Sequence, residues 1–315
     1  MNGKPLKNLA KSIHSRLLNR AKADGVSYTA VFRYYVTERF LYRLSRSIYR
    51  DHFVLKGATL FRVWKSAPFR ATADTDLLGL NIENTPEEIE RTVREIVSTA
   101  VPEDGLTFQG DLIRCSQIVH RAKYRGINVV VPVLFAGKRA PSFLHIDIGF
   151  GDPAYPDPER LALKTLLETD SEPVILCYCK ENAIAEKMEA IVWHGETNSR
   201  LKDFADVYFL SKEYSFEGRR LTESVRRTFN ARKTVIDPSL SILRNEDFLK
   251  AKSVEWSRFC SDRLLSEILP DSFPEVAAQI LEFIQPAFAA IGTGIPFRKR
   301  WTPTSGWSSV VNETD

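Results

Sequence analysis

The chain has 315 residues and a formal net charge of +4, and 43% of its residues are hydrophobic and 27% charged. This composition fits a globular protein of one large or two ordinary domains, and the absence of a long low-complexity segment or repeat excludes a repeat protein. There is no run of eighteen apolar residues and no apolar stretch behind the first residues, so we expect a cytoplasmic protein without membrane span or signal peptide.

The first fifty residues are basic and are predicted to be helical. Apolar residues recur at three- and four-residue intervals over 5–20 and 28–47, and Ser27 is a suitable cap for the second helix. The segment holds eleven Lys and Arg residues against Asp24 and Glu38, and tyrosines alternate with its arginines. Two interpretations stay open: a solvated helix face over buried aromatic residues, or a surface that follows nucleic-acid phosphates.

The middle of the chain is predicted to be a mixed sheet with helices. A strand at 53–55 is followed by a glycine turn and a short helix at 60–65. Thr85 and Pro86 mark the start of a helix that runs to about residue 100. Pro132 indicates an edge strand or a bulge. The further predicted strands are 76–81, 112–119, 126–135, 142–150 and 173–179.

Helical spacing dominates after residue 180. The predicted helices are 182–194, 199–212, 217–230, 247–262 and 273–290. The end is rich in Gly, Pro, Thr and Ser and is predicted to be a flexible tail that docks, if at all, through Trp301 or Trp307. The predicted fold is α+β, with an N-terminal helical segment packed on an α/β core, a C-terminal helical region and a tail. These parts cover 1–50, 51–180, 181–290 and 291–315.

Three aspartates are predicted to converge on neighbouring strands. Asp74 and Asp76 are two residues apart, so both point to the same side of a strand. Asp147 lies in the middle of an alternating apolar run, where strands disfavour Asp. Carboxylates on neighbouring strands suit one or two Mg²⁺ (or Mn²⁺) ions that hold substrate phosphates. The alternative is that Asp74 belongs to a turn and Asp147 pairs with an arginine.

A glycine turn precedes these acids. Gly57 follows Lys56 at the end of the predicted first strand, and Thr59 stands before the short helix. Glycine lets a backbone approach a phosphate closely, and the amides at a helix start favour anions. Thr59 is able to cap the helix or to bond a phosphate oxygen. The turn alone is a weak signal, which the acids fifteen residues on strengthen.

A third group of candidate residues lies on two later helices. Lys187 stands beside the apolar stripe of its helix, next to Ala183 and Ala190, which leave its amine room to reach into a cleft. Asp203 and Asp206 are three residues apart and are therefore neighbours on a helix surface. Taken alone, this group equally fits a solvated face of ion pairs.

These segments together resemble the nucleotidyltransferase toxins of the AbiEii/AbiGii type, the toxin half of type IV toxin–antitoxin and phage abortive-infection systems. Two departures stand out: Ala58 occupies a place where the family has Gly or Ser, and Thr75 separates the two acids where the family has Ile. The matching segments are Lys56-Gly57-Ala58-Thr59, Arg70-Ala71-Thr72-Ala73-Asp74-Thr75-Asp76, Ile146-Asp147-Ile148, Ala185-Glu186-Lys187 and Lys202-Asp203-Phe204-Ala205-Asp206.

The resemblance implies a polymerase-β-like nucleotidyltransferase core with flanking helices. It implies transfer of a nucleotide from an NTP with Mg²⁺ to an RNA acceptor, in some members the acceptor end of tRNA, which halts translation. It also implies a separate cognate antitoxin. The implied catalytic residues are Asp74, Asp76, Asp147, Lys187 and Asp203, of which the first three hold the metal; the implied nucleotide-binding residues are Lys56, Gly57, Thr59, Arg70, Thr72 and Asp206. Two alternatives stay open: a protein or small-molecule acceptor, and a non-catalytic nucleic-acid-binding protein.

Overall fold

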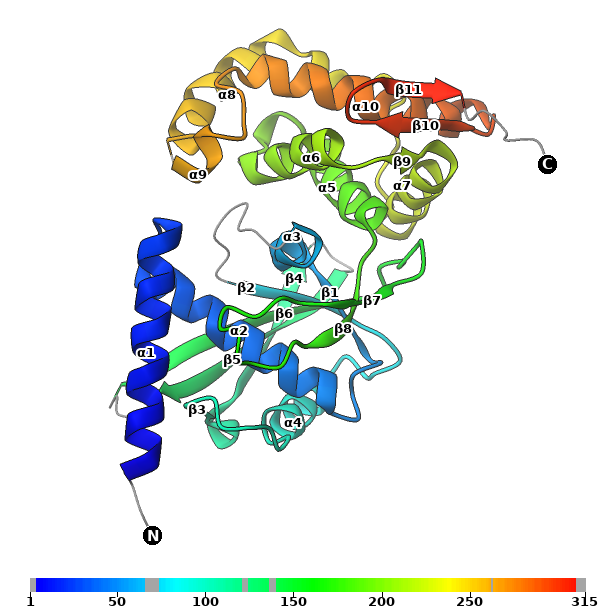
Figure 1. Ribbon diagram of the computed structural model, residues 1–315. Helices are drawn as coiled ribbons and strands as arrows, with labels where there is room; N and C mark the ends of the chain where they lie inside the picture. The colour runs from blue at the N-terminus through cyan, green and yellow to red at the C-terminus, as the bar shows by residue number, and fades with distance from the viewer. Residues whose placement is uncertain (1–3, 66–73, 121–123, 136–139, 262, 310–315) are drawn as a thin grey trace, which may run out of the picture. The chain divides into compact units, whose positions relative to one another are not determined.

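The computed structural model describes residues 4–65, 74–120, 124–135, 140–261 and 263–309. The chain forms two compact units (Figure 1). The first comprises Met1–Gly151 and Glu159–Cys177, and the second comprises Asp152–Pro158 and Tyr178–Asp315. The sequence-based limits separate the core from the helical region at 180, whereas the compact units separate at 177 and the second unit also takes in a short earlier segment.

Two helices open the first unit, α1 (Lys4–Asp24) and α2 (Tyr28–Arg46). The hydroxyl of Ser27 accepts a hydrogen bond from the backbone N–H of Ala30 at 3.2 Å, which is the predicted cap of α2. The middle of α2 is buried on nearly all sides, because Tyr35 and Phe40 are both fully enclosed. Helix α2 is therefore a core helix of this unit.

The sheet of the first unit is mixed, as predicted. Its strand order is β3-β5-β6-β2-β1-β8-β7, and β4 pairs with β5. The pairs β2–β6 and β1–β8 are parallel and the others antiparallel. The strands are β1 (Phe53–Lys56), β2 (Asp74–Gly79), β3 (Leu106–Phe108), β4 (Arg114–His120), β5 (Tyr124–Phe135), β6 (Ser142–Phe150), β7 (Glu159–Ala162) and β8 (Val174–Cys177).

One face of this sheet packs against helices. Helix α2 contacts β6 and β8, and α4 (Pro86–Val97) contacts β4 and β5. The hydroxyls of Thr37 on α2 and Thr75 on β2 lie 3.2 Å apart and are both buried. Because side chains alternate along a strand, burial of Thr75 leaves its neighbours on the other face of the sheet. The turn η1 (Gly57–Thr59) and the six-residue helix α3 (Leu60–Lys65) follow β1.

Pro132 does not mark an edge strand, which corrects that part of the sequence prediction. Strand β5 is paired on both sides, with β6 along one side and with β4 and then β3 along the other. The pairing with β4 ends at Val130 and the pairing with β3 begins at Val133. Pro132 falls between the end of the β4 pairing and the start of the β3 pairing. On that side of β5 no backbone N–H is needed for the ladder at this position, so a proline is tolerated.

The second unit is mainly helical. Helix α10 packs against α6, α7 and α8, and α5 packs against α6 and α7. By length and composition α10 is the one helix among the described residues able to cross a membrane, but its buried stripe faces the neighbouring helices, as in a core helix. The helices are α5 (Lys180–His194), α6 (Leu201–Glu213), α7 (Gly218–Arg232), α8 (Glu246–Phe259), α9 (Arg263–Ser266) and α10 (Phe273–Thr293).

Part of the segment predicted as a tail forms a packed hairpin. Strands β10 (Lys299–Thr302) and β11 (Gly306–Ser309) pair with each other, and β10 also pairs with β9 (Phe216–Glu217). The Trp301 side chain is 2% exposed, and its ring nitrogen donates to the carbonyl of Ser211 at 2.7 Å. The ring nitrogen of Trp307 donates to the carbonyl of Phe283 at 2.8 Å. Aromatic packing on α10 therefore orders a stretch whose composition is that of a loop.

The predicted fold class is confirmed. A mixed sheet with flanking helices follows two N-terminal helices, and a helical region comes after it. This is the α+β architecture expected of a nucleotidyltransferase core with a C-terminal helical region.

Candidate active site

The register of β2 and β6 brings the predicted acids together. In this parallel pair Asp76 stands opposite Asp147, and Asp74 stands opposite His145. Thr75, between the two acids of β2, and Ile146, before Asp147 on β6, are fully buried. By contrast, Asp76 and Asp147 are half-buried and Asp74 is exposed. Register partners in neighbouring strands point to the same face. The three carboxylates therefore share one face of the sheet, with Asp76 and Asp147 side by side.

Asn128 holds Asp147 from the next strand. It stands opposite Asp147 in the antiparallel β5–β6 pair, and its amide nitrogen donates to the Asp147 carboxylate at 2.7 Å. Asn128 was not among the residues predicted from the sequence. The sequence pattern that could have identified Asn128 is the one that identified Asp147. Asn128 is a polar residue inside an apolar run, between Ile127 and Val129.

Gly57 is required at its position for two physical reasons. Its φ of +70° lies in the left-handed region, which side-chain-bearing residues rarely adopt. A Cβ added there would lie 1.9 Å from Oδ2 of Asp76, which is far inside contact distance. The carboxylate of Asp76 therefore lies directly against the backbone of the turn. The predicted glycine turn and the predicted acid pair are parts of one arrangement.

Two further predicted residues of this turn lie beside the acids. Lys56 stands opposite Asp76 in the antiparallel β1–β2 pair. Thr59 is 1% exposed, and among the described residues its hydroxyl finds no hydrogen-bond partner. Leaving a buried hydroxyl unpaired destabilises a fold by about 1–3 kcal/mol. Such a group is suited to bond an oxygen of a bound ligand.

The acidic face fits a divalent cation that a substrate helps to bind. Within the described ranges, no group of three or more His, Cys, Asp and Glu side chains is arranged to hold a metal ion by itself. Mg²⁺ in proteins is usually held by one or two carboxylates together with substrate phosphates. Asp76 and Asp147 form a carboxylate pair of this kind, next to a glycine turn where the buried hydroxyl of Thr59 has no partner among the described residues.

The second unit holds the other group of predicted residues. The Lys187 amine on α5 lies 3.2 Å from Oδ1 of Asp203 on α6 and also pairs with Asp206. The three side chains are almost entirely enclosed, with Lys187 11% exposed and Asp206 fully buried. The cluster is therefore not the solvated face that the sequence left open as an alternative.

Arg200 is a fourth member of this cluster and was not predicted. Its Nε donates to Oδ2 of Asp203 at 2.6 Å, so the two oxygens of Asp203 bind Arg200 and Lys187 separately. Burial alone would raise the pKa of Asp203, but the charges of Lys187 and Arg200 outweigh it and lower the pKa below its ordinary value. Asp203 is therefore a charged carboxylate that holds the side chains of Lys187 and Arg200 in place.

The structure describes most of the predicted site residues. It places Lys56, Gly57, Thr59 and the three acids of the sheet in the first unit, and Lys187, Asp203 and Asp206 in the second. Arg70 and Thr72 lie outside the described residues.

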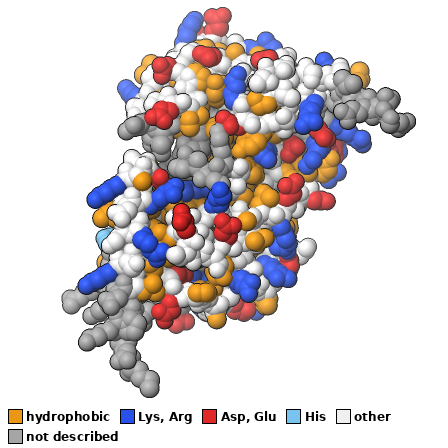
Figure 2. All heavy atoms as spheres, in the orientation of Figure 1, with side chains coloured by type: hydrophobic (Ala, Val, Ile, Leu, Met, Phe, Trp, Pro, Cys, Tyr) orange, Lys and Arg blue, Asp and Glu red, His pale blue; other side chains and the backbone are white. Residues whose placement is uncertain are grey.

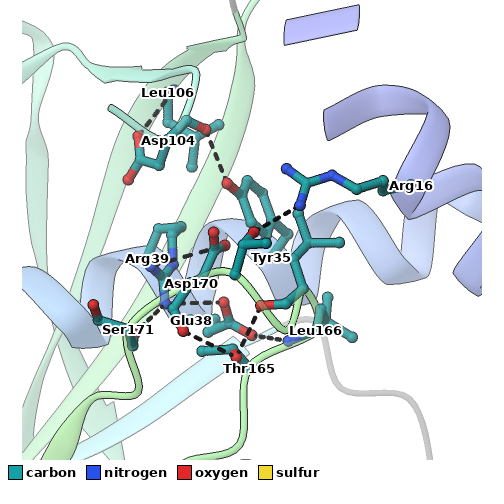
Figure 3. A network of polar contacts seen from close by, with 12 residues as sticks. Arg16, Tyr35, Glu38, Arg39, Asp104, Leu106, Thr165, Leu166, Asp170 and Ser171 are labelled. Atoms are coloured by element: carbon teal, nitrogen blue, oxygen red, sulfur yellow. Dashed lines mark hydrogen bonds and ion pairs between the residues drawn. The ribbon is translucent and has the colours of Figure 1, made fainter. Parts of the chain in front are cut away.

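Of the two interpretations left open for the basic N-terminal helices, the phosphate-following surface does not hold at Arg39 and Arg43, which are both buried. Arg39 lies 3.1 Å from Glu38 and donates to the carbonyl of Ser171 at 3.0 Å, and Figure 3 shows its guanidinium enclosed among these groups and Asp170. Arg43 is 6% exposed and binds a buried aspartate at 2.6 Å. Both arginines therefore hold the unit together, because a buried charge needs a partner.

A sheet face with paired acids beside a glycine turn is the arrangement expected of the nucleotidyltransferase class. The family model for the nucleotidyl transferase AbiEii toxin of type IV toxin–antitoxin systems matches residues 39–283. The chain belongs to this family. It is therefore an enzyme that takes an NTP as substrate, and the hypothesis of a non-catalytic nucleic-acid-binding protein is set aside.

Two solved structures are similar to the chain, both from Helicobacter pylori. One is a proposed nucleotidyltransferase, with 16% identity, a TM-score of 0.45 and coverage of 86% of this chain and 97% of that one. The other is JHP933, with 16% identity, a TM-score of 0.45 and coverage of 85% and 94%. No protein of curated function matches the chain significantly.

Proposed function

We propose that the chain transfers a nucleotide from an NTP to the 3′ end of a tRNA, in a reaction that depends on a divalent cation. The observation that carries this proposal is the pairing of Asp76 with Asp147 across β2 and β6, with Asp76 lying against Gly57. Adjacent carboxylates beside a glycine turn suit the binding of a cation together with the phosphates it neutralises.

The residues of the sheet face have distinct proposed roles. Asp74 and Asp76 hold the cation and the NTP phosphates, and Gly57 and Thr59 bind the triphosphate. Asp147 completes the cation site or accepts the proton of the attacking hydroxyl. The side-chain amide of Asn128 donates to its carboxylate and so holds it in one orientation for either role. When bound, Mg²⁺ or Mn²⁺ neutralises negative charge on the phosphates and orients them.

Lys187 is proposed to balance charge that develops on the phosphates, which is the electrostatic help that phosphoryl transfer needs most. Asp203 orients the amine, as their 3.2 Å contact supports. Asp206, predicted to bind nucleotide, is fully buried against Lys187, so its proposed contribution is to hold this amine.

The biological setting is proposed from the family. Modification of the tRNA end blocks translation, so we propose a cytoplasmic toxin that serves in phage defence. A cognate antitoxin is the partner implied by membership in a type IV system.

A labelling reaction tests the proposal. Purified protein is mixed with Mg²⁺, total RNA and each α-labelled NTP in turn, and a parallel sample contains EDTA. The expected result is label from one NTP in a tRNA-sized band, absent with EDTA. Label in protein or in small molecules would reject the RNA acceptor. Label in no fraction with any NTP would reject nucleotidyl transfer.

A further inference from the structure

Helix α7 concentrates positive charge in the second unit. Residues 217–233 contain six Lys and Arg against two Glu, and 298–300, beside the helix, add three more cations, in a chain whose net charge is only +4. So strong a local excess of one sign marks a surface that attracts the opposite charge.

Four of these six cations are exposed, namely Arg219, Arg226, Arg227 and Lys233, whereas Arg232 is held by Asp152 and Glu189. The buried side of the helix includes Leu221, Val225 and Phe229. Arg219 and Arg226 are exposed and stand seven residues apart, which is about 10.5 Å along a helix. They therefore form a line of positive charge along the outer face of the helix, and the exposed Lys233 follows directly after the helix ends at Arg232.

The C-terminal hairpin extends this line. Strand β10 pairs with β9, directly before α7, so that Arg300 stands opposite Glu217. Gly218, at the start of α7, packs so closely on Phe297 that an added Cβ would lie 2.5 Å from its ring. Figure 2 shows Lys and Arg side chains gathered around the C-terminal end of this unit, with some acids among them. The exposed residues Arg219, Arg226, Arg227, Lys233, Arg298, Lys299 and Arg300 are named the α7 surface here.

Two arginines of the α7 surface are ordered by one acid. Arg226 and Arg227 both donate to Glu223, at 2.6–2.8 Å, and the guanidinium of Arg227 lies 4.2 Å from the ring centre of Tyr155. Hydrogen bonds from Arg226, ahead of the other causes, lower the pKa of Glu223 to about 2, so this acid stays charged and keeps both guanidiniums in place. Planar guanidinium groups fixed in this way are suited to phosphate oxygens.

The composition of the surface favours a polyanion over a protein partner. Of the large apolar side chains that are exposed in the described residues, none lies on α7 or β10, and the two nearest in sequence, Val235 and Ile295, stand singly outside these elements. Protein interfaces usually need an apolar or aromatic centre, whereas nucleic-acid affinity comes largely from cations on phosphates. We propose that the α7 surface binds the phosphate backbone of the RNA acceptor. The inference rests on the proposed function, since it supplies the docking site for that acceptor.

The test compares two variants with the same change in charge. The first replaces three cations of the surface, Arg219→Gln, Lys299→Gln and Arg300→Gln. The control replaces three exposed cations of the first unit and is made as Lys11→Gln, Lys22→Gln and Arg33→Gln. Kd for tRNA is measured without NTP at several salt concentrations, after thermal melting confirms that both variants fold.

The α7 variant is expected to bind tRNA about tenfold or more weakly, with a salt slope smaller by about 2–3, because three cations are removed. The control is expected to change Kd by less than about threefold. Equal changes in the two variants, or none in either, would overturn the assignment. An equal loss of binding to polyglutamate would also overturn it, in favour of an acidic protein partner.

Transfer assays separate this inference from the proposed function. If the wild type labels tRNA and the α7 variant binds tRNA normally, the surface assignment fails and the proposed function stands. If the wild type labels no acceptor but the α7 variant alone loses tRNA, the surface assignment stands and the proposed function fails.

Discussion

The acids of the two units are of the same residue type but stand in opposite environments. Asp76 and Asp147 are half-buried on one face of the sheet, where backbone register aligns them. Asp203 and Asp206 are buried on α6 and share one lysine. A partly exposed carboxylate pair is suited to a cation and a phosphate, whereas buried opposite charges mainly fix one another. Substitutions in the first pair should therefore affect catalysis, and substitutions in the second should affect stability as well.

The largest effects are expected at the paired carboxylates of the sheet, of which Asp147→Asn is considered first. We predict a loss of transfer rate of about a thousandfold, since a neutral amide no longer attracts a cation or accepts a proton. The free energy of unfolding should change by less than about 1 kcal/mol, because the side chain is half-buried and its oxygen still accepts from Asn128. Transfer kinetics and urea unfolding measure the two quantities. If Asp147→Asn lost activity only because the protein was unfolded, the contrast between a catalytic pair in the first unit and a stabilising cluster in the second would be contradicted.

Lys187→Met should give the largest change in stability. It removes the cation that two buried carboxylates contact, and breaking a buried ion pair destabilises by about 3–5 kcal/mol. Lys252→Met is the matched control, because that lysine is equally enclosed but pairs with the half-exposed Glu255, so a change below about 1 kcal/mol is expected. Equal unfolding free energies for the two variants would show that the Lys187 cluster carries no special stability.

Gly57→Ala should combine strain with a steric clash. A left-handed conformation destabilises a non-glycine residue by about 1–3 kcal/mol, and the new Cβ would also displace the carboxylate of Asp76. We therefore expect about a hundredfold loss of transfer, in line with a misplaced catalytic group. Gly25→Ala is the control, since Gly25 has a φ of +68° and open space around it. This control should lose stability but keep full activity.

A buried acid of the first unit predicts a pH effect. Burial raises the pKa of Glu38 from 4.5 to about 7, despite the nearby charge of Arg39 and a 2.6 Å hydrogen bond from the N–H of Leu166. A raised pKa stabilises the fold below pH 4.5, and this contribution is lost as pH rises to 7. The loss amounts to at most about 3 kcal/mol. In Glu38→Gln the unfolding free energy should fall less steeply over this range, and parallel curves would contradict the assignment.

The smallest effect is expected for Arg200→Gln. Asp203 keeps Lys187 as a partner, and Arg200 is 45% exposed, so stability should change by no more than about 1 kcal/mol. Transfer should fall by less than about tenfold, mainly in kcat, if Asp203 alone is able to orient the lysine. Steady-state kinetics with the NTP measure this, and a loss as large as that of Asp147→Asn would move Arg200 into the group of essential residues.

Local patterns in the sequence were sufficient for most of the fold and for the acids. Period-two alternation located Asp147, and the spacing of Asp203 and Asp206 made them neighbours on one helix; their shared contact with Lys187 does not follow from spacing. The hairpin with Trp301 was not predicted, because its order comes from aromatic rings on a distant helix. Short strands such as β3 and β7 were also missed, since three or four residues carry too little periodicity.

Long-range partners explain the other differences. Asn128 and Arg200 gain their significance from residues on neighbouring elements, which spacing along the chain does not reveal. The arginines at 39 and 43 were interpreted from charge and from the tyrosines between them. The carboxylate of Asp104 that binds Arg43, and the carbonyl of Ser171 that accepts from Arg39, lie far away in sequence. Charge patterns indicate a surface only when the side chains are exposed, as on α7.

The most direct test of the account is the transfer rate of Asp76→Asn beside Asp111→Asn, whose carboxyl is fully exposed in the same unit. Both variants are assayed with Mg²⁺, the preferred α-labelled NTP and tRNA, and both are checked for folding by thermal melting. We predict that Asp76→Asn loses at least about a thousandfold in rate while Asp111→Asn matches the wild type. A folded Asp76→Asn protein that keeps more than about a tenth of the wild-type rate would contradict the role of the sheet face in nucleotidyl transfer.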